Sequence, residues 1–243
     1  MLNILKRFSL SILSALSLVS VSNAQAPSHG EQVILLHGIA RSASHMEDLE
    51  AFLKEKGYTV YNLDYPSTSH TLEKLTAIVA ADIASKIRAD KPVHFIGYSM
   101  GGIVTRAVLN KFRPDNLGRV VQLASPNNGS EVADFLKDNW LYEKVYGPAG
   151  KQLVTDGAGI DDLLGKVDYE LGVVAGTFSI DPVSSSLIPG DDDGKVSVES
   201  TKVDGMKDHV LVYASHTFFP QNEDVKAHAL EFIRYGKFIK NNK

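Results

Sequence analysis

Residues 92–104 read P-V-H-F-I-G-Y-S-M-G-G-I-V, and this stretch decides the fold. The apolar run after Pro92 predicts a short buried strand, because parallel strands covered on both faces are apolar along their length. Apolar residues then recur at helical spacing from Ile103 onward. Between them, G-Y-S-M-G-G matches G-x-S-x-G, the sequence of a sharp strand–turn–helix corner that exposes a serine. The alternative is a glycine-rich turn in which Ser99 only caps the helix.

The corner would hold Ser99 in a chemically useful place. A turn this tight strains the serine backbone, and glycines on either side let the strand and the helix approach each other. The hydroxyl would stand at the helix N-terminus, where free N–H groups and the positive end of the helix dipole favour negative charge on a reacting oxygen. The sequence therefore predicts Ser99 as a nucleophile.

Composition limits the classes of function. The chain has 243 residues, of which 44% are hydrophobic and 22% charged, as in a soluble globular protein with one domain of ordinary size. The formal net charge of −4 leaves no basic footprint, so nucleic acid is not an expected partner. The chain has no cysteine, which excludes disulfides, thiolate catalysis and cysteine-ligated zinc.

The first residues carry the pattern of an export signal. Lys6 and Arg7 precede an apolar stretch at 8–21, and Ser22-Asn23-Ala24 follows as a small-x-small cleavage site. These features predict a signal peptide over residues 1–24, a mature domain over 25–243, and a periplasmic or extracellular location. Cleavage after Ala26 and a retained N-terminal anchor are the alternatives.

Strands and helices are expected to alternate before the corner. Residues 33–36 form an apolar run that His37-Gly38 ends, and residues 58–63 form a second predicted strand. Capping-box spacing at 44–47 predicts a helix start, and a longer amphipathic helix is expected after Thr71. This alternation predicts an α/β fold with a mainly parallel central sheet and helices on both faces.

These residues resemble those of a known family. A strand ending in His37-Gly38-Ile39, two strand–helix units and G-Y-S-M-G-G are similar to the α/β-hydrolase superfamily, and within it to the small secreted bacterial lipases and esterases. The resemblance covers nearly the whole chain after residue 24. It implies that the backbone N–H groups of Ile39 and Met100 form an oxyanion hole. It also implies a structural role for His37, whose alternative is that of a catalytic base.

The predicted acid lies in the stretch 190–196, G-D-D-D-G-K-V. In the lipase resemblance the acid is an aspartate in a D-G-x-V setting, which among these three only Asp193 has; Asp191 and Asp192 are the alternatives. Clustered aspartates are also typical of calcium loops. Some secreted lipases bind calcium through an aspartate just before the catalytic histidine, and here that place is Ser215. We therefore expect no cofactor, with calcium as the alternative.

Two histidines flank the next predicted strand, residues 210–214. Catalytic groups gather at the carboxyl ends of parallel strands, which places His216 on the expected edge of the sheet and His209 on the opposite one. The chain order Ser99, Asp193, His216 is the order found in α/β hydrolases. The sequence therefore predicts a Ser99–Asp193–His216 triad.

Residues 132–170 interrupt the alternation and lie between two predicted sheet strands. We expect a small cap that shapes an acyl pocket, and a packed structural excursion is the alternative. The glycines of this segment disfavour one rigid covering helix. Its aromatic residues, Phe135, Trp140, Tyr142 and Tyr146, would suit contact with lipid. The tract S-P-N-N-G-S at 125–130 resembles a turn that follows the same strand in lipase-like hydrolases.

The predicted reaction is hydrolysis of lipid or short- to medium-chain carboxylic esters through an acyl-enzyme on Ser99. The same groups could instead perform acyl transfer, thioester hydrolysis or amide cleavage, since pocket and water access decide the acceptor. A non-catalytic binding protein on this fold is a further alternative. The expected partners are a small-molecule or lipid ester and, transiently, a lipid surface.

Overall fold

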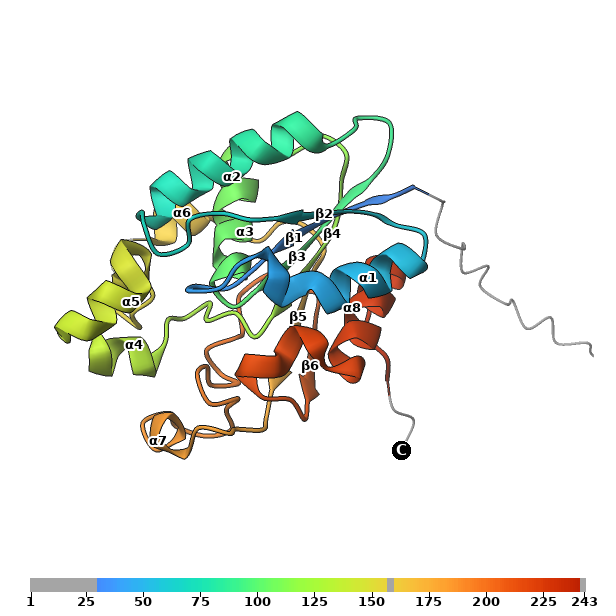
Figure 1. Ribbon diagram of the computed structural model, residues 1–243. Coiled ribbons are helices and arrows are strands. Elements are labelled where there is room, and N and C mark those ends of the chain that lie inside the picture. The colour runs from blue at the N-terminus through green and yellow to red at the C-terminus, as the bar shows by residue number, and fades with distance from the viewer. Residues whose placement is uncertain (1–29, 157–159, 241–243) are drawn as a thin grey trace, which may run out of the picture.

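The computed structural model describes residues 30–156 and 160–240 (Figure 1). Its centre is a six-stranded sheet in the order β2-β1-β3-β4-β5-β6, in which every neighbouring pair is parallel. The strands are β1 (Gln32–Leu36), β2 (Thr59–Leu63), β3 (Val93–Tyr98), β4 (Leu117–Leu123), β5 (Leu171–Gly176) and β6 (Asp208–Val212). All carboxyl ends therefore meet at one edge of the sheet.

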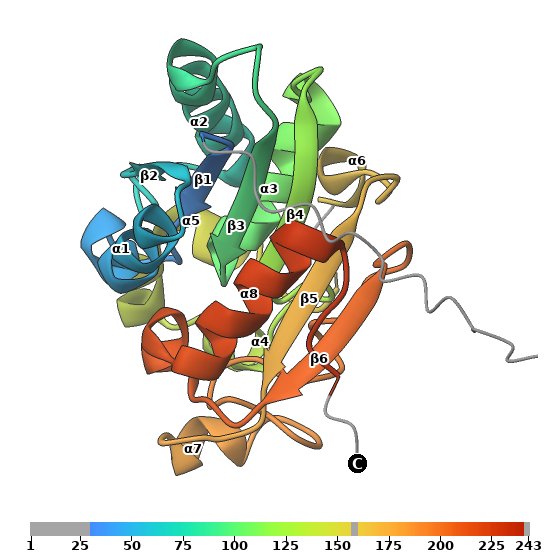
Figure 2. The ribbon, with the colours of Figure 1, turned by 90° about the vertical axis from the view of Figure 1, so that its right-hand side faces the viewer.

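Helices cover both faces of this sheet (Figure 2). The helical segments are η1 (Ala43–Met46), α1 (Glu47–Glu55), α2 (Leu72–Lys86), α3 (Met100–Phe112), α4 (Glu131–Leu136), α5 (Trp140–Lys151), α6 (Asp161–Leu164), α7 (Pro182–Ser185), η2 (His216–Gln221) and α8 (Glu223–Tyr235). Helices α2 and α3 lie on one face, and α1 and α8 on the other (Figure 1). The predicted fold class is confirmed.

The two cores follow from the alternation of side chains along each strand. On β1, Ile34 and Leu36 pack under α2 and α3, while Val33 and Leu35 pack under α1 and α8. All four side chains are fully buried. Burying one such side chain stabilises the fold by about 1.5–3 kcal/mol, so an apolar run without polar interruptions is what a doubly covered strand requires.

Several predicted boundaries are shifted. Strand β6 begins at Asp208 and ends at Val212, so His209 is its second residue, and His216 begins η2. The predicted capping box at 44–47 is wrong, because this segment forms the single turn η1, whose N-cap Ser42 makes no capping hydrogen bond with its side chain. The signal peptide predicted for residues 1–24 lies outside the described residues.

The segment between β4 and β5 contains the short helices α4, α5 and α6, with a kink at Gly147, whose φ is 64°. Figure 1 shows α4 and α5 beyond the carboxyl ends of the strands. Phe135 and Trp140 are exposed there, whereas the side chain of Tyr142 lies outside the described part. Within residues 30–156 and 160–240, we find no helix with the length and apolar character needed to cross a membrane.

Candidate active site

Ser99 occupies the corner between β3 and α3 in a strained conformation. Its φ is 53° and its ψ is −125°, a region that residues with a side chain rarely adopt. The turn is held by two backbone hydrogen bonds: Ser99 N–H donates to Leu123 O at 2.8 Å, and Gly102 N–H donates to Ser99 O at 3.0 Å. Tertiary structure thus fixes the direction of the Ser99 side chain.

The glycines around Ser99 are needed because backbones approach closely there. A Cβ added to Gly97 would lie 2.5 Å from the Cα of Gly102, and one added to Gly101 would lie 2.2 Å from the carbonyl oxygen of Leu36. A Cβ on Gly102 would lie 2.0 Å from Ser125 Oγ. The G-x-S-x-G pattern is therefore a packing requirement of this corner.

The structure brings the three predicted triad residues into contact. His216 Nε2 lies 3.1 Å from Ser99 Oγ, and His216 Nδ1 lies 2.7 Å from Asp193 Oδ2. A carboxylate only accepts, so Nδ1 carries the ring proton and Nε2 is left to accept the hydroxyl hydrogen of Ser99. The side chain of Asp193 is 1% exposed and that of His216 is 12% exposed. The arrangement has the geometry of a nucleophile, a base and an orienting acid.

Asp193 is held by more than its contact with the imidazole. Its Oδ1 accepts the backbone N–H groups of Lys195 at 3.0 Å and Val196 at 2.9 Å. Its carbonyl oxygen accepts the backbone N–H of His216 at 2.9 Å, so acid and base are joined twice. Three donors thus converge on one buried carboxylate, which fixes its orientation toward the imidazole.

The neighbouring candidates point elsewhere. Asp192 Oδ1 accepts the hydroxyl of Ser185 and the backbone N–H of Gly194, both at 2.6 Å. Asp191 is exposed at the surface of the same loop. His209 Nε2 lies 3.0 Å from Thr201 Oγ1, and burial lowers the pKa of His209.

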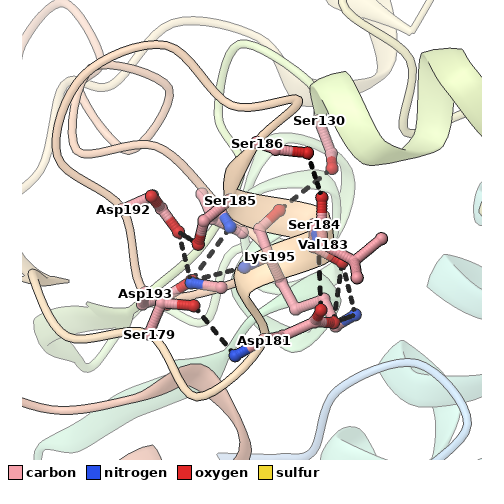
Figure 3. A network of polar contacts seen from close by, with 12 residues as sticks. Ser130, Ser179, Asp181, Val183, Ser184, Ser185, Ser186, Asp192, Asp193 and Lys195 are labelled. Carbon is pink, nitrogen blue, oxygen red and sulfur yellow. Dashed lines mark hydrogen bonds and ion pairs between the residues drawn. The ribbon is translucent and has the colours of Figure 1, made fainter.

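An ammonium group organises the loop around the acid (Figure 3). Lys195 Nζ donates to Asp181 Oδ2 at 2.7 Å and to Ser184 Oγ at 3.0 Å. Lys195 and the donors of Ser184 hold the pKa of Asp181 well below its usual range. Among the described residues, no three His, Asp or Glu side chains cluster in a way that could hold a metal ion. Lys195 supplies the positive charge in this acidic loop.

His37 supports the loop that follows β1. Its Nδ1 donates to Gly38 O at 2.8 Å, and its Nε2 accepts the backbone N–H of Tyr65 at 3.3 Å. The Tyr65 ring stacks on the imidazole at a centroid distance of 4.3 Å. Burial lowers the pKa of His37, which favours the neutral ring. These contacts fit a structural histidine.

Two residues that the sequence analysis did not single out surround His216. The hydroxyl of Tyr98 donates to the backbone carbonyl of His216 at 2.6 Å. The Tyr98 ring lies 5.2 Å, between centroids, from both His45 and His216. Burial, with the charge of Arg41, lowers the pKa of His45 to about 4. Tyr98 occupies a variable position of G-x-S-x-G, and the motif therefore gives no signal for it.

A cavity of about 320 Å³ opens beside Ser99. Its lining comes from the loop after β1, the 125–130 tract, the cap and the acid and base loops: Gly38, Ile39, Ala40, Arg41, Tyr98, Ser99, Pro126, Ser130, Val132, Ala133, Leu136, Val145, Tyr146, Leu153, Lys195, Val196, His216 and Thr217. The part of this lining that comes from residues 132–153 is mostly apolar, as is usual in pockets for small molecules.

The predicted oxyanion residues flank Ser99. Ile39 lines the cavity, and a Cβ added to the preceding Gly38 would lie 3.1 Å from Ser99 Cβ. Met100 is the first residue of α3, so its N–H has no acceptor within the helix. Met100 thus adjoins Ser99 in the sequence, and Ile39 follows a glycine that lies close to Ser99 in space.

The 125–130 tract is connected to α3 and to the segment before β5 through half-buried polar contacts. Asn127 Oδ1 accepts from Arg106 at 2.9 Å, and Asn127 Nδ2 donates to Gln122 Oε1 and to Thr201 O, each at 2.7 Å. Arg106 also donates to Gly165 O at 3.2 Å. No sequence pattern points to this network, because its members are far apart in the chain.

A larger hollow of about 830 Å³ lies at the opposite, amino-terminal edge of the sheet. Its His94 contacts Glu31 at 3.3 Å, and its Arg119 is paired with Glu170 at 2.5 Å. These partners make His94 structural. Ser99 and His216 line the smaller cavity, and no triad residue lines this larger one.

Comparison with known proteins assigns the family. The family model described as palmitoyl protein thioesterase matches residues 32–158, just over half of the chain. The chain belongs to the palmitoyl protein thioesterase family. The matched region contains Ile39, Ser99 and Met100 but ends before Asp193 and His216.

Curated thioesterases are similar over part of their length. The chain is 32% identical to the lysosomal thioesterase PPT2 homolog of Drosophila melanogaster over 139 residues, 54% of this chain and 46% of that protein. It is 31% identical to the lysosomal thioesterase PPT2 of Homo sapiens over 117 residues, 45% of this chain and 38% of that protein. The chain thus spans less than half the length of these relatives.

Solved structures show the same fold. The Bacillus licheniformis lipase BlEst2 in mature form superposes with a TM-score of 0.70 at 19% identity, covering 87% of this chain and 93% of that one. The metagenomic carboxyl esterase MGS0156 superposes with a TM-score of 0.65 at 18% identity, covering 78% and 65%. These neighbours identify an α/β-hydrolase fold in this palmitoyl protein thioesterase family member.

Proposed function

We propose that this protein hydrolyses fatty-acyl thioesters through an acyl-enzyme on Ser99, with carboxylic esters as a second substrate class. The observation that carries the proposal is the chain of contacts Ser99–His216 (3.1 Å) and His216–Asp193 (2.7 Å), which lies beside a cavity that is apolar on the side of residues 132–153. Membership of the palmitoyl protein thioesterase family favours the thioester. Carboxylic esters stay a candidate because the same triad geometry attacks either carbonyl.

The reaction has two halves. Ser99 Oγ bonds to the acyl carbon while its proton moves to His216 Nε2, and Asp193 stabilises the imidazolium. The C–S bond then breaks, and His216 returns the proton to the leaving thiolate. Water then attacks the acyl carbon of the acyl-enzyme and gives up a proton to His216. The bond from Ser99 Oγ to the acyl carbon breaks, His216 returns the proton to Ser99, and the fatty acid is released.

Two backbone N–H groups, of Ile39 and Met100, are proposed to hold the negative oxygen during both halves. Donors fixed before the reaction need no rearrangement as charge develops, and one such donor can lower the barrier by about 3–4 kcal/mol. The position of Met100 at the start of α3 adds the favourable end of the helix dipole.

The test has two parts. A fluorophosphonate probe should label the wild-type protein at Ser99 and leave Ser99→Ala unlabelled, with peptide mass spectrometry locating the adduct. Turnover of S-decanoyl and O-decanoyl substrates with otherwise matched structures then ranks the two classes by kcat/KM. Ser99→Ala should lose about a thousandfold or more. Turnover of Ser99→Ala within tenfold of wild type would overturn the proposal.

We also propose that the protein is exported after cleavage between Ala24 and Gln25, on the pattern of residues 1–24. N-terminal sequencing of protein from the periplasm or medium should begin at Gln25. Cytoplasmic protein that retains Met1 as its only form would contradict this.

A further inference from the structure

Large apolar side chains are exposed around the mouth of the acyl cavity. We call them the apolar rim: Phe135, Trp140, Val145, Val183 and Phe218, which are 67%, 73%, 45%, 75% and 59% exposed. They come from α4, α5, α7 and η2. Figure 1 shows α4 and α5 next to each other at the left-hand side of the molecule and α7 apart from them at the lower left, all beyond the carboxyl ends of the strands. Exposed apolar groups gathered at one end of a protein mark a contact surface.

The rim is continuous with the cavity lining. Val145 is exposed and also lines the cavity. Phe135 directly precedes the lining residue Leu136, and Phe218 directly follows the lining residue Thr217. Rim residues therefore adjoin lining residues both on the α4–α5 side of the opening and on the η2 side.

Access to Ser99 decides between the occupants of such a rim. A folded protein without an acyl group, seated on residues at both sides of the opening, would close the cavity and stop substrate entry. A fluid lipid surface would bury the same side chains and deliver acyl groups through the opening. This step rests on the proposed acyl-hydrolase function.

The charges nearby favour a neutral lipid. Residues 131–151 carry four acidic side chains, Glu131, Asp134, Asp138 and Glu143, and three basic ones, Lys137, Lys144 and Lys151. Lys137 lies 3.9 Å from Asp156, and Lys195 is paired with Asp181. Strong attraction to anionic lipid needs a cluster of unpaired basic groups, which is not the pattern of these cap residues.

We propose that the apolar rim docks this protein onto a neutral phospholipid surface, with the opening of the acyl cavity facing the lipid. Docking is driven by apolar burial and therefore changes little with salt. Trp140 suits the interface between headgroups and acyl chains, where an amphipathic indole ring is stable.

The chain offers a direct probe, because Trp140 is its only tryptophan and belongs to the rim. The experiment uses the full chain carrying Ser99→Ala, so that lipid is not hydrolysed, mixed with phosphatidylcholine vesicles. We expect a blue shift of Trp140 emission and quenching by lipids brominated in their acyl chains. Phe135→Ser and Phe218→Ser should each weaken vesicle partitioning tenfold or more.

Phe112→Ser is the matched control. Phe112 is 56% exposed but lies at the end of α3, away from the rim, so its loss should leave partitioning unchanged. Equal weakening by Phe112→Ser and Phe218→Ser would overturn the proposal. So would unchanged Trp140 emission with vesicles, or a dimer in sedimentation that the rim variants convert to monomer. Phe218→Ser is also made in protein that retains Ser99. Its turnover of a dissolved substrate should equal that of wild type, which shows that the variant loses docking and not catalysis.

Discussion

Tyr98 and His216 are joined by a hydrogen bond of 2.6 Å from the phenol to the histidine's backbone carbonyl. Tyr98 precedes the candidate nucleophile on β3, while His216 is the first residue of η2, which follows β6. The bond therefore ties the base to the strand that carries the serine. Tyr98 is buried, and burial raises the pKa of its phenol, which keeps the hydroxyl hydrogen available for donation.

Tyr98→Phe should lower kcat more than it raises KM. The change removes a hydrogen bond to a half-buried carbonyl, which costs about 0.5–1.5 kcal/mol, and frees the backbone that positions the imidazole. We expect kcat to fall by about tenfold, measured with a dissolved thioester. Tyr58→Phe is the control, since Tyr58 is also buried but lies at the amino-terminal edge of the sheet. Equal loss in both variants would point to general destabilisation.

Asp193→Asn and Asp192→Asn test the acid with adjacent residues. In Asp193→Asn a neutral amide replaces the carboxylate and cannot stabilise the imidazolium, so kcat should fall by about a thousandfold or more. Asp192 bonds to Ser185 and Gly194, so its replacement should lower the thermal midpoint and cost activity far less. Both kcat and Tm are measured for each variant. The opposite ranking in kcat would move the acid by one residue.

Gly102→Ala should destabilise the corner, because its Cβ would lie 2.0 Å from Ser125 Oγ. Overpacking of this kind costs about 1–3 kcal/mol or more, and we expect a lower midpoint in urea unfolding. Adding Ser125→Gly removes the nearest clashing atoms and should recover part of the loss. A double variant no more stable than Gly102→Ala would show that other contacts decide the cost.

His45 makes stability depend on pH. Its pKa is 6.5 in an unperturbed chain and about 4 in the folded protein, so between these values the unfolded chain binds more protons. The part of the unfolding free energy that depends on His45 is then complete above about pH 6.5 and is lost as the pH falls toward 4. His45→Gln should flatten the fall in Tm over this range, and its offset from wild type should be constant above pH 7. An unchanged slope would contradict this.

The features that could be predicted from the sequence are those that depend on short continuous segments. A buried strand, a helix and the glycines between them decide the corner at Ser99, and strand ends place His216 on the same edge of the sheet. The family resemblance, rather than periodicity, selected Asp193, Ile39 and Met100. The Asn127 network, the Lys195–Asp181 pair and Tyr98 escaped prediction because each depends on contacts between distant segments. The start of β6 was missed because polar Asp208 and His209 interrupt the apolar pattern.

The double connection between Asp193 and His216 divides the candidate site into two bodies. The serine lies at the centre of the sheet, whereas the acid and the base lie on two segments outside the strands, which are joined to each other and which Tyr98 ties to β3. On warming, the segments that carry Asp193 and His216 should therefore detach together before the sheet unfolds. The protein would then pass through a state that is folded but catalytically inactive, and activity would return on cooling.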